Sequence, residues 1–242
     1  MILEKMSNSL GLPQEHILGI AHAASHSYKR YEIAKRSGGT RTILHPAKPL
    51  KALQRWLSQQ VVANWPVHHA AMAYRPGISI RDNATAHRER NYLLRMDFSD
   101  FFPSIRDSDI ERYMQDRPST FQMWSPQDIE IFCSLVLRFG VLTIGAPTSP
   151  GLANAICHDM DVELAGLASK YQATYTRYAD DLCFSTKQPD VLANVEAEVH
   201  KIISPLTTPA GLALNHSKTR HSSRKGARRV TGIVLGSDGK VH

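Results

Sequence analysis

Residues 175–182 read YTRYADDL, and this stretch guides the interpretation of the whole sequence. Two adjacent aspartates, Asp180 and Asp181, lie between runs that predict two strands joined by a tight turn at Ala179-Asp180-Asp181. Neighbouring carboxylates repel one another, and a half-buried carboxylate is costly unless a cation neutralises it. An Asp-Asp pair is also common in solvated loops, so the neighbouring motifs must decide between a loop and a metal site.

Asp97 adds a third carboxylate, because it follows an apolar strand expected over residues 92–96. Three carboxylates at one edge of a sheet can hold two Mg²⁺ ions about 3.5–4 Å apart. One ion would activate a primer hydroxyl, and the other would stabilise a leaving pyrophosphate. We therefore expect Asp97, Asp180 and Asp181 to be the catalytic residues and the ligands of two Mg²⁺ ions.

Charge is distributed unevenly along the 242 residues, whose formal net charge is +7. Residues 29–55 hold eight Lys or Arg and one acid, residues 215–229 hold six Lys or Arg and no acid, and acids gather at residues 97–116. Basic surface on either side of an acidic centre suits a protein that binds a polyanion and holds metal ions with its carboxylates. Solvated charged faces produce similar runs, so this pattern is supporting evidence only.

The three cysteines, Cys133, Cys157 and Cys183, are far apart and show no CxxC spacing. They predict core thiols in a reducing compartment rather than a zinc site. No apolar run reaches transmembrane length, and the opening MILEKMSNSLGL lacks the layout of a signal peptide. We therefore expect a cytoplasmic protein with no membrane partner.

The chain is long enough for one large domain or two closely joined subdomains. Helices are expected within roughly the first 25 residues and at 50–62, 107–115, 126–139, 150–168 and 190–203. Strands are expected at 92–96, 212–214 and 230–235. Two hairpins are expected, one at 31–43 with its turn at Ser37-Gly38-Gly39 and one at 174–184. Because these elements mix without a strict βαβ alternation, the sequence predicts an α+β fold with an antiparallel sheet.

Several motifs occur in the order found in reverse transcriptases. They are GGTRTILHPAKPLKALQRW at 38–56, LRMDFSDFFPSI at 94–105, GAPTSPGLAN at 145–154, YADD at 178–181 and GLALNHSKT at 211–219. NATAH at 83–87 and VTG at 230–232 resemble the NAxxH and VTG signatures of the retron enzymes in particular. The resemblance covers residues 31–235, and it favours retrons over group II intron, CRISPR-associated and diversity-generating relatives.

The resemblance implies a right-hand polymerase fold, with fingers at residues 1–90 and a palm at 91–242 whose antiparallel sheet is flanked by helices. A segment at about 115–148 would also contribute to the fingers. Only a short turn and three residues follow residue 235, so we expect the helical thumb of the family to be absent or truncated.

The resemblance also implies an RNA-directed DNA polymerase that copies a cognate structured noncoding RNA with deoxynucleotide triphosphates. Retron enzymes prime from the 2′-hydroxyl of an internal guanosine, make branched RNA–DNA and commonly work with an effector protein in phage defence. Two other interpretations stay open: a reverse transcriptase of another bacterial lineage, group II intron-like or CRISPR-associated, and an RNA-binding scaffold for an effector.

The resemblance assigns roles around the three aspartates. Phe98 would offer its backbone carbonyl to the metal, whereas Asp100 and Phe101 would be structural. Phe102 matches the aromatic gate that leaves no room for a ribose 2′-hydroxyl. Lys218 matches a lysine proposed to protonate the departing pyrophosphate, or it contacts the template backbone.

Other matching residues would approach the nucleotide from the fingers. Lys35 and Arg41 would neutralise the triphosphate, and the alternative is that they are solvated charges of the hairpin. Gly145 and Ala146 would allow a base pair to approach closely. Here the sequence departs from the family, because Ile144 stands where a glutamine usually contacts the incoming nucleotide.

The two retron signatures have less certain roles. Asn83 and His87 are four residues apart and would share one face of a helix. Either they read RNA or they pin the fingers loop to the palm, and a structural or RNA-orienting role is favoured over proton transfer. Val230, Thr231 and Gly232 are assigned only as a family signature.

Overall fold

The structure is a computed structural model that describes residues 2–34, 39–236 and 240–241. The chain folds into two compact units, and each is built from two separate stretches. Unit 1 comprises Met1–Trp65 and Phe102–Ile156, and unit 2 comprises Pro66–Phe101 and Cys157–His242. The expected boundaries of fingers and palm stay a prediction.

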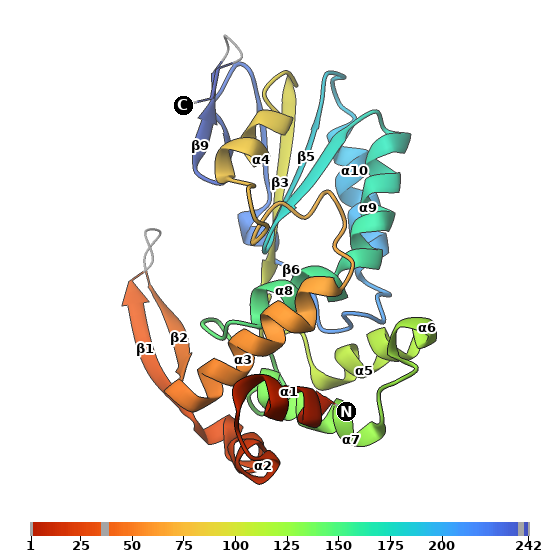
Figure 1. Cartoon of the computed structure of the whole chain (residues 1–242). Coiled ribbons are helices and arrows are strands. Elements are labelled where there is room, and N and C mark those ends of the chain that lie inside the picture. The colour runs from red at the N-terminus through yellow and green to blue at the C-terminus, as the bar shows by residue number, and fades with distance from the viewer. Residues whose placement is uncertain (1, 35–38, 237–239, 242) are drawn as a thin grey trace. The chain divides into compact units, whose positions relative to one another are not determined.

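Unit 1 is mostly helical. Its elements are α1 Ile2–Leu10, α2 Gln14–His22, β1 Tyr28–Ala34, β2 Thr40–Pro46, α3 Lys48–Gln60, α5 Asp107–Gln115, α6 Pro118–Phe121, α7 Pro126–Val136 and α8 Ser149–Ile156. The strands β1 and β2 form an antiparallel hairpin that runs from the pair Tyr28–Pro46 to the pair Ala34–Thr40 (Figure 1). This confirms the expected hairpin, whose turn at 35–38 lies outside the described residues.

The core of unit 1 is organised around Trp65. The indole stacks on Tyr113 at 5.0 Å between ring centroids and meets the edge of Phe121 at 5.2 Å. It also packs at a tilt on Phe132, whose side chain is fully buried in α7. Aromatic rings bury large apolar areas, so this cluster accounts for much of the cohesion between α5, α6 and α7.

Unit 2 is built on an antiparallel sheet. Its elements are α4 Ile80–Ala86, β3 Tyr92–Ser99, α9 His158–Lys170, β4 Thr174–Tyr178, β5 Asp181–Thr186, α10 Leu192–Ile203, β6 Ala213–Leu214, β7 Arg220–Ser223, β8 Arg228–Val230 and β9 Ile233–Leu235. Short 3₁₀ turns complete the two units at Ala24–His26, Val62–Asn64 and His216–Lys218.

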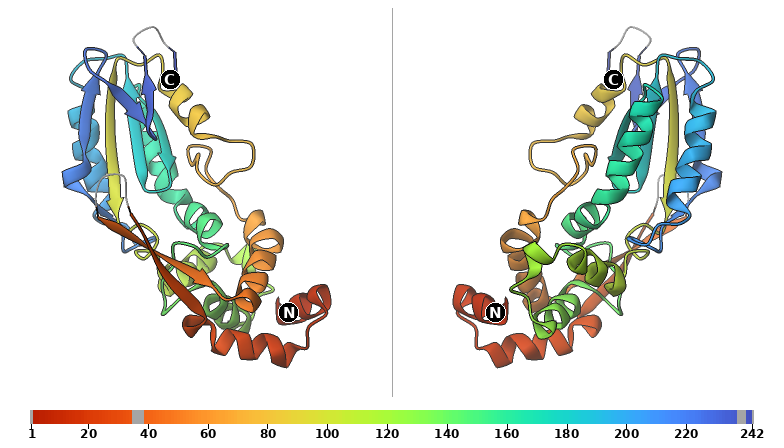
Figure 2. Two further views of the ribbon diagram at one scale, coloured as in Figure 1. Left: turned by 90° about the vertical axis from the view of Figure 1, so that its left-hand side faces the viewer. Right: turned by 90° about the vertical axis from the view of Figure 1, so that its right-hand side faces the viewer.

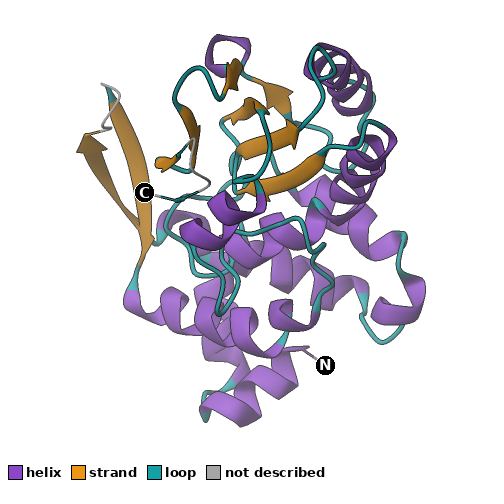
Figure 3. Ribbon diagram, turned by 90° about the horizontal axis from the view of Figure 1, so that it is seen from above, coloured by secondary structure: helices purple, strands orange, loops and turns teal. Residues whose placement is uncertain are grey.

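The sheet of unit 2 has the order β4-β5-β3-β6, and β7 also pairs with β3. The helices α9 and α10 pack against each other and cover one face of it (Figures 1 and 2). The strands β8 and β9 form a separate hairpin. Figure 3 shows strands and helices together in the view from above. The named strand pairs of unit 2 are all antiparallel. This mixture of helices with an antiparallel sheet confirms the expected α+β fold class.

Two expected elements were wrong. The single helix expected at 150–168 is interrupted at Cys157, where α8 ends and α9 begins with Asp159 and Asp161 in its first turn. Acids at that position suit the start of a new helix, because they face its positive end. The strand expected at 230–235 is the hairpin β8–β9, and its turn places Thr231 and Gly232 at φ of 48° and 86°.

The sequence interpretation also missed α4 and β7, which are short polar elements with weak periodicity. No helix in the described ranges is long and apolar enough to cross a lipid bilayer.

Asp128 ties two helices of unit 1 together. Its carboxylate completes a capping box with Ser125 at the start of α7, and it accepts a hydrogen bond of 2.7 Å from the backbone N–H of Ile2. Burial would raise the pKa of Asp128, but the hydrogen bonds from Ile2 and Ser125 outweigh burial and lower it to about 2. A carboxyl with a depressed pKa stabilises the fold above its unfolded pKa, and this contribution is lost as the pH falls toward 2.

We therefore expect Asp128→Asn to lower the free energy of unfolding at pH 7 by about 1–2 kcal/mol, the usual cost of a lost cap. The difference from the unsubstituted chain should shrink as the pH falls from 5 to about 2. Urea denaturation at several pH values measures this. Asp116→Asn, which changes an exposed acid, is the control. A difference that does not depend on pH would contradict the assignment.

Candidate active site

Strand pairing brings the predicted carboxylates together in unit 2. Asp97 near the end of β3 lies directly opposite Asp181 at the start of β5. Asp180 occupies the turn between β4 and β5, and its carbonyl accepts a 3.0 Å hydrogen bond from the backbone N–H of Phe98. Residues directly opposite in an antiparallel pair are about 4.5–5.5 Å apart, so the register places like charges side by side.

Two cations lie against these carboxylates. Lys218 Nζ donates to Asp97 Oδ1 at 2.6 Å, and Arg95 donates to Asp181 Oδ1 at 3.4 Å. Burial raises the pKa of Asp180, and the charges of Asp97 and Asp181 raise it further. Burial also raises the pKa of Asp181, although Arg95 opposes this shift. The carboxylates are therefore incompletely neutralised by the protein alone.

The chemistry of this donor set fits a divalent cation, because carboxylate oxygens are the ligands that Mg²⁺ prefers. Within the described ranges, however, no three side chains of His, Cys, Asp or Glu already stand grouped around a position for a metal ion. In this structure Lys218 and Arg95 are the cations beside the carboxylates. Sequence reasoning missed Arg95, although its place two residues before Asp97 puts both side chains on one face of β3.

The aromatic residues after Asp97 belong to two different units. The Phe98 ring is buried and stacks on Phe101 at 5.9 Å between centroids, which agrees with a structural role for Phe101. Phe102, the expected gate, is half-buried at the start of the second stretch of unit 1. Its carbonyl accepts a hydrogen bond from the N–H of Ile105.

Gly145 and Ala146 lie in unit 1, next to the β1–β2 hairpin. The Ile144 carbonyl accepts a 2.8 Å hydrogen bond from the Leu44 N–H. Gly145 has a φ of 116°, and a Cβ atom on it would lie 2.7 Å from the Leu44 carbonyl oxygen. Glycine is therefore required here by backbone contact within the unit, and Ala146 beside it is buried.

The two expected triphosphate ligands belong to the β1–β2 hairpin. Arg41 is exposed on β2, opposite Ile33 of β1. Lys35 lies outside the described residues.

Asn83 and His87 are fully buried, which leaves no surface through which they can touch RNA directly. His87 Nε2 lies 2.8 Å from Thr176 Oγ1, and His87 Nδ1 lies 2.6 Å from Ser185 Oγ. The Thr176 hydroxyl donates to Asn83 Oδ1 at 2.6 Å, so it accepts from His87 Nε2–H. The ring is then neutral, with Nδ1 accepting from Ser185, and it joins α4 to β4 and β5.

The VTG residues form the turn that packs on the same helix. Val230 is fully buried in a cluster with Ala84 and Cys183. The Thr231 hydroxyl donates to the carbonyl of Ile80 at 3.4 Å. The two sequence signatures are thus neighbours in space, and Gly232 lets the chain turn between β8 and β9.

Comparison with known proteins agrees with this arrangement. Residues 33–235 match the family described as reverse transcriptase (RNA-dependent DNA polymerase). The retron Ec83 and Ec86 reverse transcriptases of Escherichia coli are 31% and 30% identical over 95% and 98% of this chain, and the matches cover 74% and 72% of their own lengths. The chain belongs to the retron-type reverse transcriptases.

Other retron relatives are longer. The retron Mx162 reverse transcriptase of Myxococcus xanthus is 36% identical over 98% of this chain, which spans only 54% of that protein. The chain therefore spans about half the length of this relative.

Solved structures with a similar fold include telomerases. A Candida tropicalis telomerase truncated from its C-terminal domain aligns over 89% of this chain and 54% of its own length, with a TM-score of 0.57 and 14% identity. A Candida albicans telomerase in complex with a fragment of telomeric RNA aligns over 88% of this chain and 46% of its own length, with a TM-score of 0.58 and 14% identity. These likenesses confirm the polymerase fold class.

The backbone contact at Gly145 gives a stability prediction. Gly145→Ala should destabilise unit 1 by on the order of 1–2 kcal/mol, because an L-residue is strained at positive φ and its Cβ would clash with the Leu44 carbonyl. Gly19→Ala is the matched control in α2, where nothing lies within 4 Å and alanine favours the helix. Thermal unfolding of both variants measures the effect, and equal stability would contradict it.

The buried imidazole gives a pH prediction. Burial lowers the pKa of His87 to about 3, so folded His87 stays neutral while unfolded histidine takes up a proton near pH 6.5. Its contribution to stability is then complete above about pH 6.5 and falls as the pH drops toward 3. We expect His87→Gln to be less stable at pH 7 and to lose less stability between pH 7 and 4.

The control for that experiment is His22→Gln, which removes an exposed histidine from α2. This variant should keep the pH dependence of the unsubstituted chain in the same denaturation series. If His87→Gln and His22→Gln change the pH profile equally, His87 is not the buried neutral group described above.

Proposed function

We propose that this chain carries the polymerase core of an RNA-directed DNA polymerase. The observation that carries the proposal is the pairing of Asp97 with Asp181 next to the turn at Asp180. Three carboxylates at one end of a sheet have little structural value, because burial and their mutual repulsion raise the pKa of Asp180, and holding these groups ionised destabilises the fold. Nucleotidyl transfer explains why they are held together.

Asp97, Asp180 and Asp181 would hold the divalent cations on which the family depends, and we propose two Mg²⁺ ions, with the Phe98 carbonyl as a further ligand. Bound there, the ions would supply Lewis-acid stabilisation of the phosphates and lower the pKa of the primer hydroxyl. The chain itself holds the carboxylates in register through β3 and β5.

Lys218 and Arg95 have a part in this proposal. Each lies beside one of the carboxylates and limits their repulsion before nucleotide and metal arrive. The Lys218 side chain remains about half exposed, so it can also turn toward phosphate and give up a proton to the leaving pyrophosphate. A contact of Lys218 with the template backbone is the alternative role.

For the residues of unit 1, we propose that Arg41 and Lys35 neutralise the triphosphate and that Phe102 excludes ribonucleotides. Gly145 and Ala146 would accept the nascent base pair. Their supporting evidence is the match to the family motifs.

RNA is the proposed template. Supporting evidence is the family match, the RNA complex of the Candida albicans telomerase, and the basic residues at 29–55 and 215–229. From the retron relatives we further propose a cognate structured RNA, priming from an RNA 2′-hydroxyl to give branched RNA–DNA, and an effector protein acting with it in phage defence.

The test is primer extension on an RNA template with the four deoxynucleotides and Mg²⁺. Asp180→Asn combined with Asp181→Asn should reduce synthesis by at least about 10³-fold, because the transition state loses its metal ligands. RNA affinity should change little, since these groups do not face phosphate directly in the proposal. Glu163→Gln, on the exposed face of α9, is the matched control.

Wild-type synthesis by the double variant would refute the carboxylate mechanism. RNA binding by the unsubstituted chain without any synthesis would instead favour the scaffold for an effector. The nucleic acid that copurifies with the protein separates the retron priming from ordinary 3′-hydroxyl priming, because only the former leaves a branched linkage.

A further inference from the structure

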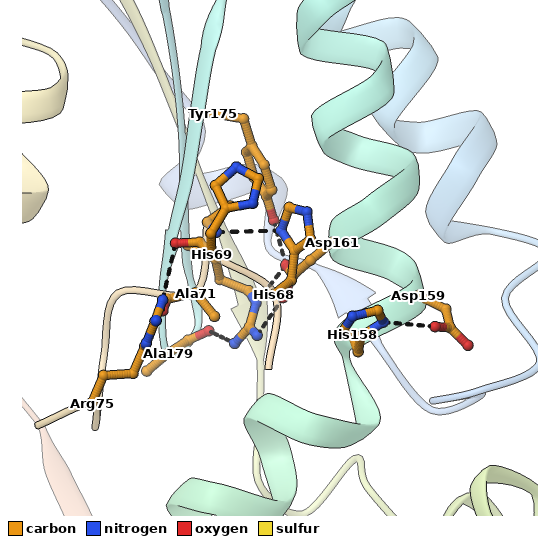
Figure 4. A network of polar contacts seen from close by, with 11 residues as sticks. His68, His69, Ala71, Arg75, His158, Asp159, Asp161, Tyr175 and Ala179 are labelled. Atoms are coloured by element: carbon orange, nitrogen blue, oxygen red, sulfur yellow. Dashed lines mark hydrogen bonds and ion pairs between the residues drawn. The ribbon is translucent and has the colours of Figure 1, made fainter. Parts of the chain in front are cut away.

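Arg177 is the last but one residue of β4, three residues before the first aspartate of the proposed catalytic turn, and it is fully buried. Its guanidinium makes two parallel hydrogen bonds to the equally buried carboxylate of Asp161, at 2.8 Å from Nε and 2.7 Å from Nη2. The remaining terminal nitrogen donates to the carbonyl of Ala179 at 3.2 Å. Figure 4 shows Asp161 and Ala179 in this network.

Asp161 is itself held from two sides. It lies in the first turn of α9, which packs on β4. The hydroxyl of Tyr175, two residues before Arg177 on the same strand, donates to Asp161 Oδ1 at 2.8 Å. The carboxylate thus receives hydrogen bonds at both oxygens, which fixes its orientation and that of the guanidinium it binds.

The backbone of Arg177 is anchored as well. Its N–H donates to the carbonyl of Ala70 at 2.7 Å, and its carbonyl accepts from the N–H of Met72 at 2.8 Å. Residues 70–72 therefore line the outer edge of β4, which is the last strand of the sheet. With both the main chain and the side chain fixed, Arg177 cannot shift without moving the strand.

A buried ion pair is by itself poor evidence for stability, because apolar residues of similar volume often serve the fold as well or better. What apolar residues cannot supply is the hydrogen bond to the Ala179 carbonyl. Ala179 has a φ of 57°, a left-handed conformation that costs an L-residue roughly 1–2 kcal/mol. Such strain persists only where the surroundings hold it, and the Arg177 guanidinium is the group placed to do so.

We propose that Arg177 and Asp161 are positioning residues for catalysis. Through the carbonyl of Ala179, the pair sets the conformation of the turn that presents Asp180 and Asp181. The pair reaches the turn through the Ala179 carbonyl, so we expect it to act on the orientation of the aspartates rather than on their charge. The catalytic part of this inference rests on the proposed polymerase function, whereas the structural part does not.

The decisive variant replaces the whole pair by apolar residues, Arg177→Met with Asp161→Leu. Because no lone buried charge remains, the fold should survive, with a melting temperature lowered only by the loss of hydrogen-bond partners for the Tyr175 hydroxyl and the Ala179 carbonyl. Primer extension should show kcat lower by on the order of 10–100-fold, as expected for misplaced reacting groups, with KM for deoxynucleotides within about threefold. Glu163→Gln on the same helix should match the unsubstituted chain.

Arg177→Lys tests geometry against charge. Lysine keeps the positive charge but lacks the planar fork that bonds Asp161 twice and Ala179 once. Arg177→Lys should therefore lower kcat about as much as the double variant does. Because lysine keeps a positive charge beside Asp161, Arg177→Lys also serves as the test where the double variant does not fold.

Amide hydrogen exchange distinguishes a role in positioning the turn from a general contribution to the stability of the fold. The amides of Ala179, Asp180 and Asp181 should exchange faster in the double variant, while those in the centre of β3 should not change. Unchanged kcat, or unchanged exchange at the turn, in a folded double variant would overturn the proposal. If the unsubstituted chain does not polymerise at all, the proposed function fails, and the exchange comparison still decides whether the pair holds the turn.

Discussion

Repulsion among three carboxylates at one end of a β-sheet is the constraint on which unit 2 depends. Register makes the repulsion unavoidable, because pairing of β3 with β5 sets Asp97 opposite Asp181. Two cations from different elements of the unit form ion pairs with these carboxylates. Arg95 reaches Asp181 diagonally across the strands, and Lys218 reaches Asp97 from the 3₁₀ turn after β6. Burial and the charges of Asp97 and Asp181 still raise the pKa of Asp180, and Lys218 opposes this shift only in part.

The strand β4, which leads to the turn at Ala179 and Asp180, is fixed on both of its faces. Alternate residues of a strand point to opposite sides, so Tyr175 and Arg177 reach Asp161 on α9, whereas Thr176 between them meets His87 below α4. These polar contacts are fully buried, and a buried polar group that loses its partner costs about 1–3 kcal/mol. Such contacts are therefore sensitive to orientation in a way that apolar packing is not, which suits the strand before a catalytic turn.

Local patterns predicted the elements that local forces determine. The YADD hairpin and the strand ending at Asp97 could be found because carboxylates next to apolar runs are unusual. Partners across the fold could not be found in this way, since Asp161 looks like any exposed acid in the sequence HDMDVEL and only α9 packing on β4 buries it. The break at Cys157 was missed for a similar reason, because both sides of it are helical and only tertiary structure separates them. A buried arginine inside an apolar strand was the available signal, because it requires a buried acid as partner.

Ile144 shows how one position can depart from a family motif without disturbing the fold. Its main-chain carbonyl bonds the Leu44 N–H, and any residue type can make this contact. The constrained position is Gly145, the next residue. Its φ is 116°, and a Cβ atom on it would lie 2.7 Å from the Leu44 carbonyl oxygen, so only glycine fits there. Backbone geometry thus constrains Gly145 and leaves the side chain of Ile144 unconstrained by this hairpin contact. The hairpin contact therefore gives no structural reason to prefer a glutamine to an isoleucine at this position.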